Sequence, residues 1–154
     1  MKYTIGIDFG TLSARAVILD ATGVIMGDCT VEYPHGVMDK ALPDGTPLAQ
    51  DYAFQHPDDY LFALKSSISG ALDTASLKPA DISAICIDFT SCTLVAHKAD
   101  GTPICNISGF ESDPHAYVKL WKHHAAQPQA DQINALATQR KEPWLSMYGG
   151  KICR

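Results

Sequence analysis

The sequence has no apolar run of about 18 residues, so it predicts no membrane-spanning helix. It also lacks the basic and apolar opening of a secretory signal, because Met1-Lys2-Tyr3-Thr4 leads directly into a strand pattern. Excess positive charge is missing too: 12 lysines and arginines stand against 17 aspartates and glutamates, which gives a net charge of −5. This balance argues against nucleic acid or an anionic membrane surface as a partner.

Metal-ligand and disulfide spacings are also missing. The five cysteines include no Cys-x-x-Cys pair, which favours reduced thiols in a cytoplasmic protein over a disulfide framework or a zinc site. None of the six histidines pairs with a histidine or cysteine at the i, i+4 spacing of a helical zinc site, which argues against a metal site built from them. These residues are Cys29, Cys86, Cys92, Cys105 and Cys153, with His35, His56, His97, His115, His123 and His124.

The first 34 residues predict a three-stranded antiparallel meander. Tyr3 to Ile7, Ala14 to Leu19 and Val24 to Tyr33 are apolar strand patterns with turn residues between them. Residues 34–56 are richer in proline, glycine and aspartate and predict an extended excursion. An excursion of that length in a compact domain is usually functional or ordered by a partner.

A helix is predicted to open at His56-Pro57-Asp58-Asp59, because proline in a first turn costs no hydrogen bond and the two acids face the positive end of the helix dipole. Leu77-Lys78-Pro79 ends it. Its apolar face is expected to hold Leu61, Leu64, Ile68, Ala71 and Ala75. The next segment, Asp81 to Asp88, is almost continuously apolar, which predicts a central, parallel strand covered on both faces.

The remaining elements are shorter. A hairpin is expected to join Leu94–Ala99 to Pro103–Ile107 through an Asp100-Gly101 turn. Tyr117 to Trp121 alternates as a strand does, although Asp113-Pro114 could also begin a helix there; we favour the strand. Residues 126–139 predict a second helix.

The loop after the first strand carries a candidate phosphate site. Gly10 can take positive φ, so that consecutive backbone amides form a concave anion site. Thr11 and Ser13 add hydroxyl donors, and Arg15 adds a fixed positive charge. Asp8 fits beside a phosphate only if a divalent cation such as Mg²⁺ lies between them. An ordinary turn remains the alternative, whereas the absence of Gly-x-x-x-x-Gly-Lys-[Ser/Thr] excludes a P-loop.

A second polar cluster follows the predicted central strand, where open α/β sheets place ligands. Its members are Asp88, Phe89, Thr90, Ser91, Cys92 and Thr93. A turn or capping carboxylate remains the alternative for Asp88, as core packing does for Trp121 and a solvated strand position for Arg15.

In order and spacing, these segments resemble the amino-terminal part of the FGGY carbohydrate kinases over essentially the whole chain. The motifs are Asp8-Phe9-Gly10-Thr11 with Ser13-Ala14-Arg15, Gln55-His56-Pro57-Asp58-Asp59-Tyr60, Asp88-Phe89-Thr90-Ser91-Cys92-Thr93, Leu120-Trp121-Lys122-His123-His124 and Tyr148-Gly149-Gly150-Lys151-Ile152. The last two resemble members that phosphorylate L-ribulose in arabinose catabolism. Other pentulose kinases, such as xylulokinase, and nucleotide-binding scaffolds of the actin or heat-shock-70 type remain alternatives.

The resemblance implies an α/β, actin-like (ribonuclease H-like) ATPase domain, with helices packed on a mixed sheet that starts with the antiparallel meander. It places ATP phosphates at Asp8, Gly10, Thr11, Ser13 and Arg15, with Asp8 in the shell of a Mg²⁺ ion through water. It places a ketopentose sugar at Asp88, Phe89, Thr90, Ser91, Cys92, Trp121, Lys122 and His123. His123 stands where other members often carry an acid.

The same resemblance implies a two-domain kinase of which residues 1–154 are the incomplete sugar-binding side. The general base, an aspartate, is expected beyond Arg154, and so is the ATP-binding domain. A homodimer is left open. The chain alone is therefore expected to lack activity, because phosphoryl transfer needs the positioned nucleophile as well as the phosphate site.

Overall fold

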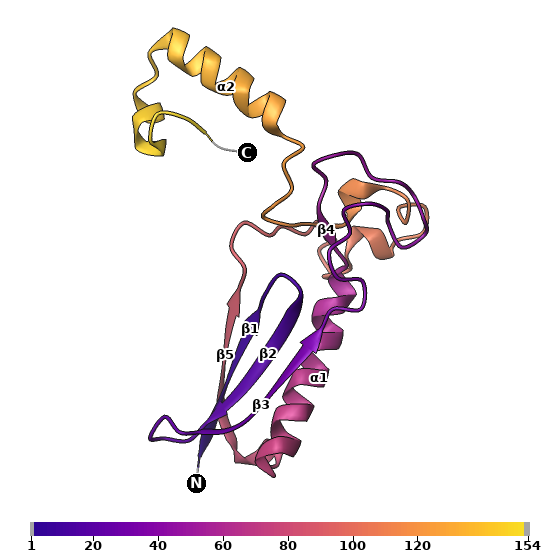
Figure 1. Ribbon diagram of the computed structural model, residues 1–154, viewed down its shortest axis with the longest axis vertical. Coiled ribbons are helices and arrows are strands. Elements are labelled where there is room, and N and C mark those ends of the chain that lie inside the picture. The colour runs from indigo at the N-terminus through magenta and orange to yellow at the C-terminus, as the bar shows by residue number, and fades with distance from the viewer. Residues whose placement is uncertain (1, 153–154) are drawn as a thin grey trace.

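A computed structural model describes residues 2–152 of the chain; the predicted free thiol of Cys153 lies outside this range. Four strands form a mixed sheet in the order β3-β2-β1-β5 (Figure 1). They are β1 (Tyr3–Phe9), β2 (Ser13–Leu19), β3 (Ile25–Glu32) and β5 (Ile82–Phe89). The first three are antiparallel neighbours, and β5 runs parallel to β1, so the predicted meander and parallel strand are confirmed.

Helix α1 (Pro57–Ala75) lies along one face of this sheet (Figure 1). His56 caps its start by accepting a hydrogen bond from the backbone N–H of Asp58 at 3.3 Å, and Ser76 ends it in the left-handed conformation. The buried residues between helix and sheet are Tyr3, Ile5, Ile7, Phe9, Ala14, Ala16, Ile18, Tyr33, Ala63, Ala71 and Leu72. Alternate residues of β1 and β2 therefore form the main core with α1.

The helix face against the sheet is lined by smaller residues than predicted. Ala63, Ser67 and Ala71 are buried, whereas Leu61 is 57% exposed, so its assignment to the apolar face was wrong. The predicted Leu64 and Ile68 pack only at the edge of the core. Small side chains are needed here because the helix comes very close to β3, where Gly27 faces the α1 backbone.

Strand β5 is the edge strand of the described sheet, which corrects the prediction of a central strand covered on both faces. Ile85, Ile87 and Phe89 are each about half exposed, although their partners in β1 are buried. A groove of about 500 Å³ lies between α1 and the first half of β5, and its lining includes Ile68, Leu72 and Ile85. The helix covers β2 and β3 and leaves the apolar side of β5 open.

A second, irregular layer adjoins the amino-terminal end of α1. Strands β4 (Phe54–Gln55) and β6 (Val118–Lys119) pair antiparallel, so the predicted strand at 117–121 is present but short, and it follows a 3₁₀ turn at Pro114–Ala116. The excursion at 34–56 forms a second core together with residues 105–117, made of Met38, Leu42, Phe54, Cys105, Ala116 and Tyr117.

The hairpin predicted around Asp100-Gly101 is present as a turn with a short stretch of pairing and without regular strands. Lys98 and Thr102 are joined across it by a backbone hydrogen bond, and Gly101 has φ of 86°. Beyond the turn, His97 and Pro103 form an isolated bridge, and residues 104–106 form a 3₁₀ helix in place of a strand.

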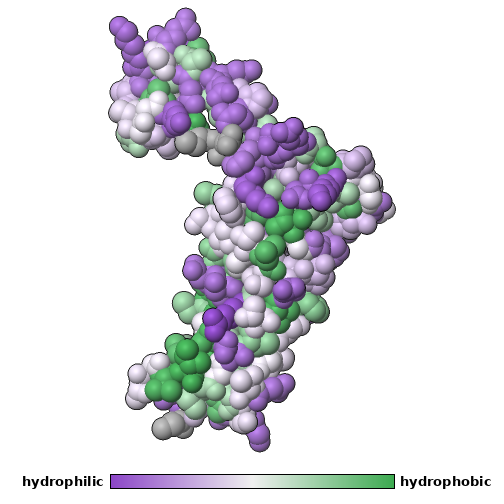
Figure 2. Space-filling model, viewed as in Figure 1, coloured by the Kyte–Doolittle hydropathy of each residue, from purple (hydrophilic) through white to green (hydrophobic). Residues whose placement is uncertain are grey.

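Helix α2 (Gln127–Arg140) confirms the second predicted helix and lies apart from the four-stranded sheet (Figure 1). Ala130 and Ala137 are buried on it, while Ile133 and Leu136 remain partly exposed. Hydrophobic surface also gathers over the β2–β3 turn, where Val24 and Ile25 are exposed (Figure 2). No helix within residues 2–152 is long and apolar enough to cross a membrane.

The close approach of β3 and α1 predicts that Gly27→Ala destabilises the fold. A Cβ at this position would lie 2.7 Å from the Ala75 nitrogen and 2.8 Å from the Ala71 carbonyl oxygen, and backbone atoms cannot turn away as a side chain can. We expect a loss of about 2 kcal/mol in the free energy of unfolding by chemical denaturation. Gly6→Ala is the matched control, since nothing lies within 4 Å of its added Cβ; equal losses at both positions would contradict the packing account.

Candidate functional site

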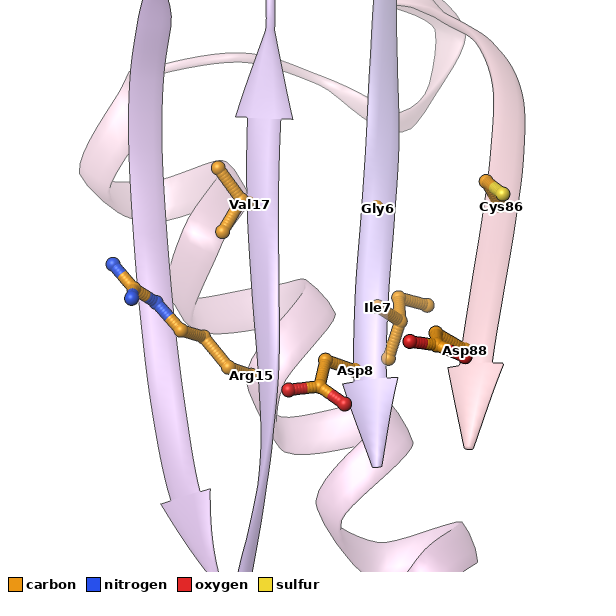
Figure 3. A pocket seen from close by; sticks show the side chains of 7 residues that line it. All are labelled: Gly6, Ile7, Asp8, Arg15, Val17, Cys86 and Asp88. Atoms are coloured by element: carbon orange, nitrogen blue, oxygen red, sulfur yellow. The ribbon is translucent and has the colours of Figure 1, made fainter. Parts of the chain in front are cut away.

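The pairing of β1 with its two neighbours brings the predicted phosphate residues beside Asp88 of the predicted sugar segment. Asp8 pairs with Arg15 of β2 on one side and with Asp88 of β5 on the other. Because side chains alternate along a strand, these residues share the sheet face turned away from α1 (Figure 3). They line a shallow hollow of about 230 Å³ whose floor includes Gly6 and Cys86.

Arg15 is turned away from Asp8. Its Nε and Nη2 atoms donate to one carboxylate oxygen of Asp28 on β3, at 3.1 and 2.6 Å. The pair is exposed, so it contributes on the order of 0–1 kcal/mol to stability. Arg15, which was predicted to bind a phosphate, therefore pairs with the Asp28 carboxylate in this structure.

Asp8 and Asp88 keep free carboxylate oxygens in the hollow. Asp8 makes no side-chain hydrogen bond or ion pair with any residue in the range 2–152, and Asp88 accepts only the backbone N–H of Phe89 at 2.9 Å. Two carboxylates on adjacent strands repel each other unless a cation lies near them. Their oxygen atoms fit a hard divalent cation such as Mg²⁺.

The β1–β2 loop (Gly10–Leu12) is held from several sides. Gly10 donates to the Ser13 carbonyl at 2.9 Å and accepts from the Tyr33 hydroxyl at 3.2 Å. The prediction of positive φ at Gly10 is wrong. Glycine is favoured there for another reason, because an added Cβ would lie only 3.3 Å from the Ser13 carbonyl oxygen.

Thr11 is the point where separate predicted segments meet. Its carbonyl accepts from Gln55 Nε2 at 2.7 Å, and its hydroxyl oxygen accepts from Trp121 Nε1 at 3.2 Å. Trp121 is 50% exposed, so it is not the core aromatic that the sequence left open as an alternative. The structure therefore joins a residue predicted for the sugar to a residue predicted for the phosphates.

The β5 loop (Thr90–Thr93) is attached to the end of β1. The backbone N–H and the hydroxyl of Thr90 both donate to the Phe9 carbonyl, at 3.0 and 2.9 Å. The rings of Phe89 and Phe9 stack with centroids 4.6 Å apart. A pocket of about 180 Å³ lies here, lined by Phe9, Gly10, Tyr60, Phe89, Thr90, Thr93, Val95 and Val118. Ser91 and Cys92 are exposed and do not line it, and Cys92 has φ of 57°.

Lys122 and His123 are placed differently from Trp121. Lys122 lines a separate hollow with Asp39, Lys40 and Asp51. His123 Nδ1 accepts the backbone N–H of Ala53 at 3.1 Å, and its ring packs against Phe54. Burial, reinforced by the positive charge of Lys119, lowers the pKa of His123. Both residues therefore lie with the 34–56 segment, and neither has a hydrogen bond to Thr11 among residues 2–152.

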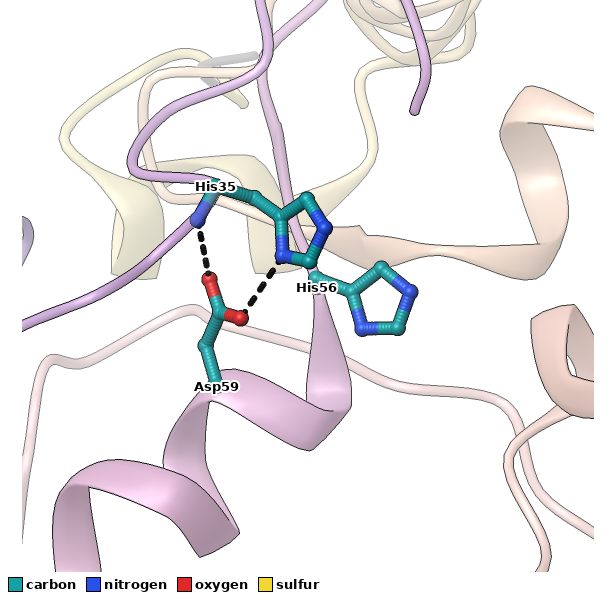
Figure 4. Close-up of side chains that lie close together, drawn as sticks. All are labelled: His35, His56 and Asp59. Carbon is teal, nitrogen blue, oxygen red and sulfur yellow. Dashed lines mark hydrogen bonds and ion pairs between the residues drawn. The ribbon is translucent and has the colours of Figure 1, made fainter. Parts of the chain in front are cut away.

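A cluster of His35, His56 and Asp59 escaped the sequence analysis (Figure 4). Buried Asp59 accepts from the His35 backbone N–H at 3.0 Å and contacts His35 Nδ1 at 2.8 Å. The two imidazole rings stack at 4.5 Å, and possible ligand atoms lie within 4.8 Å of one another. Both Asp59 oxygens and His56 Nδ1 already have hydrogen bonds, so these atoms are used within the protein and not held ready for a metal ion. The cluster instead links the 34–56 excursion to the start of α1. In the sequence, only the spacing His56-x-x-Asp59, which places two of the three residues near each other at the start of a helix, indicates this cluster.

The chain was also compared with known proteins. No family model matches the chain. The chain is 53% identical over 155 residues to the ribulokinase of Mycolicibacterium smegmatis and 46% identical over 152 residues to that of Geobacillus thermodenitrificans. Each match covers 98% of this chain and 27% of the relative, so the chain spans about a quarter of the length of these proteins. The chain is therefore homologous to ribulokinases along nearly all its length.

Solved structures resemble the fold at lower identity. A xylulose kinase from Brucella ovis superposes with a TM-score of 0.68 at 16% identity, covering 90% of this chain and 25% of its own. A gluconate kinase from Lactobacillus acidophilus gives 0.62 at 19% identity, with 90% and 23% covered. These neighbours support an α/β fold with a mixed sheet and helices.

The lowered pKa values of His56 and His123 predict a pH-dependent stability. Both are lowered chiefly by burial, so below the ordinary histidine value of about 6.5 the unfolded chain binds protons that the folded chain does not. The free energy of unfolding should therefore decrease as the pH falls below about 6.5, measured by urea denaturation. His123→Gln should weaken this dependence, and exposed His97→Gln should not. Identical slopes in both variants would count against the assignment.

Proposed function

We propose that this chain forms the sugar-binding side of an ATP-dependent ketopentose kinase, with L-ribulose as the sugar and an actin-like (ribonuclease H-like) ATPase fold. The geometry that carries the proposal is the junction at Thr11, where the β1–β2 loop meets Trp121. A kinase must bring a phosphoryl donor and a hydroxyl acceptor together, and this junction connects the segments assigned to each. Similarity to ribulokinases supports the choice of sugar.

In this proposal, ATP phosphates lie against the β1–β2 loop at Gly10, Thr11 and Ser13. Asp8 would hold the accompanying Mg²⁺ through water, and Asp88 lies beside it as a second carboxylate on the same face. The ion would offset the negative charge of the transferring phosphoryl group. Arg15 would exchange its Asp28 partner for a phosphate oxygen, a change made easy by the exposure of the pair.

The sugar would contact the end of β5 and the loop that follows it, from Asp88 to Cys92, and the exposed indole of Trp121. Lys122 and His123 both lie with the 34–56 segment. They would contact the sugar only after a conformational change that moved them towards the β5 loop. The pocket beside Thr90 and Tyr60 adjoins the β1–β2 loop at Gly10 and is lined by residues that carry hydroxyl groups.

The general base and the ATP-binding domain are proposed to come from further polypeptide. The ribulokinases that match this chain are about four times its length. The half-exposed apolar side chains of β5 support additional covering structure, because they lie on the same sheet face as the buried β1 residues with which they pair. We extend the proposal to a homodimer of the complete kinase, which size measurement of that protein tests.

A chimaera tests the proposed function. Residues 1–154 would replace the matching segment of the M. smegmatis ribulokinase, and ADP release would be measured with L-ribulose, D-ribulose, D-xylulose or no sugar. We expect release that depends on L-ribulose, and no release from the 154-residue chain alone. Release independent of sugar would favour a nucleotide-binding scaffold of the actin or heat-shock-70 type. A preference for D-xylulose would move the assignment to another pentulose kinase.

The proposed metal role of Asp8 predicts a large loss of turnover on Asp8→Asn in the chimaera. The amide is uncharged and would hold the ion's water less strongly, so kcat should fall about 100-fold or more. Thermal unfolding should change little, because Asp8 is exposed on the sheet face. Asp73→Asn, on the exposed side of α1, is the matched control and should leave kcat unchanged. Near-normal turnover of Asp8→Asn would remove Asp8 from the mechanism.

A further inference from the structure

The buried side chain of Gln55 connects β4 to the β1–β2 loop across 44 residues of sequence. It is 1% exposed, which is unusual for a glutamine unless its amide is fully paired. Nε2 donates to the Thr11 carbonyl at 2.7 Å, and Oε1 accepts from the Tyr60 hydroxyl at 2.6 Å. Both ends of the amide are therefore used.

The direction of this short chain of hydrogen bonds is fixed by chemistry. A backbone carbonyl can only accept, so the amide nitrogen must face Thr11. The Tyr60 phenol stays protonated near neutral pH, because burial raises its pKa to about 12, and it can therefore donate to Oε1. Hydrogen bonds arranged head to tail in this way strengthen one another in a buried setting.

Thr11 is thereby held at two atoms. Gln55 holds its carbonyl from the buried side, and Trp121 donates to its hydroxyl oxygen from the exposed side. Since that oxygen already accepts, the Thr11 hydroxyl hydrogen remains able to donate to an anion. Gln55 itself lines neither the hollow at Asp8 nor the pocket at Thr90, so it is not placed to touch a ligand.

We infer that Gln55 is a positioning residue for phosphoryl transfer, which sets the place of the β1–β2 loop by holding the Thr11 carbonyl. This inference rests on the proposed function. Without Gln55, the loop would keep the Tyr33, Ser13 and Trp121 contacts and its general path, but the Thr11 carbonyl would lose its partner on the buried side. Small errors in such a position reduce turnover strongly, because the reacting groups must lie within a narrow range of distances.

Two substitutions separate positioning from mere space filling. Gln55→Met fills similar volume and has no donor for the Thr11 carbonyl. Gln55→Glu has a donor only when its carboxyl group is protonated, and an ionised carboxylate would repel the carbonyl oxygen that it faces. Burial favours the neutral form of a glutamate and raises its pKa towards neutral pH. The substituted carboxyl group should therefore become protonated as the pH falls from about 8 to about 6. Gln132→Glu, on the exposed surface of α2, is the matched control.

In the chimaera, we expect kcat to fall about 100-fold for both variants at about pH 8, with the KM for L-ribulose changed less than about threefold. Between about pH 8 and pH 6, the kcat of Gln55→Glu relative to the unsubstituted chimaera should rise about tenfold, and that of Gln55→Met should stay level. The titratable neighbours are Tyr60 and His56, whose pKa is lowered by burial, and comparison at each pH removes their contribution. Equal, pH-independent ratios for both variants, or wild-type turnover in both, would overturn the inference.

A second readout uses the 154-residue chain and needs no activity. The sequence has two tryptophans, so Trp144→Phe leaves Trp121 as the reporter beside Thr11. In that background, the Trp121 emission of Gln55→Glu should differ from the parent at about pH 8 and approach it at about pH 6. Unchanged emission at both values would contradict the positioning role. If the unsubstituted chimaera is inactive, the proposed function fails, and this measurement still decides whether Gln55 controls Thr11.

Discussion

The candidate site depends on the register of β1 between an antiparallel and a parallel neighbour. Asp8 faces the open side of the sheet between Arg15 and Asp88, while Ile7 and Phe9 face α1. A slip of one residue would turn the carboxylate into the helix-facing core and expose the isoleucine. The buried residues of β1 and β2 prevent that slip, so the packing energy of the core also fixes where the charges stand.

The loop beyond β1 uses a different kind of support. It has few apolar contacts of its own and is held by hydrogen bonds from Tyr33, Gln55 and Trp121, which belong to three other parts of the chain. Each bond to a neutral group contributes about 1 kcal/mol, too little to fold the loop alone. Together they restrict Thr11 from both its buried and its exposed side. The irregular second layer therefore acts as a support for the end of the regular sheet.

Much of this arrangement was predictable from local patterns. Alternating apolar residues located the meander, and proline followed by acids located the start of α1 at His56. Patterns could not show that Leu61 would face solvent, because the close packing of α1 on Gly27 depends on two elements at once.

The missed side-chain pairs have a similar cause. Arg15 with Asp28, His35 with Asp59, and Gln55 with Thr11 are 13, 24 and 44 residues apart, and sequence spacing carries no signal for such contacts. The buried pairs emerge only once the strands and the helix are packed. The glycine at position 10 was predicted to matter, but for a backbone angle and not for the nearby Ser13 oxygen that the structure shows.

The position of β5 at the edge of the sheet has a consequence for handling the protein. An edge strand presents unpaired backbone groups, and here they lie beside Ile85, Ile87 and Phe89, with no lysine or proline among the strand residues to block them. Natural proteins shield such edges because they template the addition of strands from other molecules. While this edge is uncovered, we expect concentrated solutions of the 154-residue chain to aggregate. One charged substitution among the half-exposed residues of β5 should reduce that aggregation.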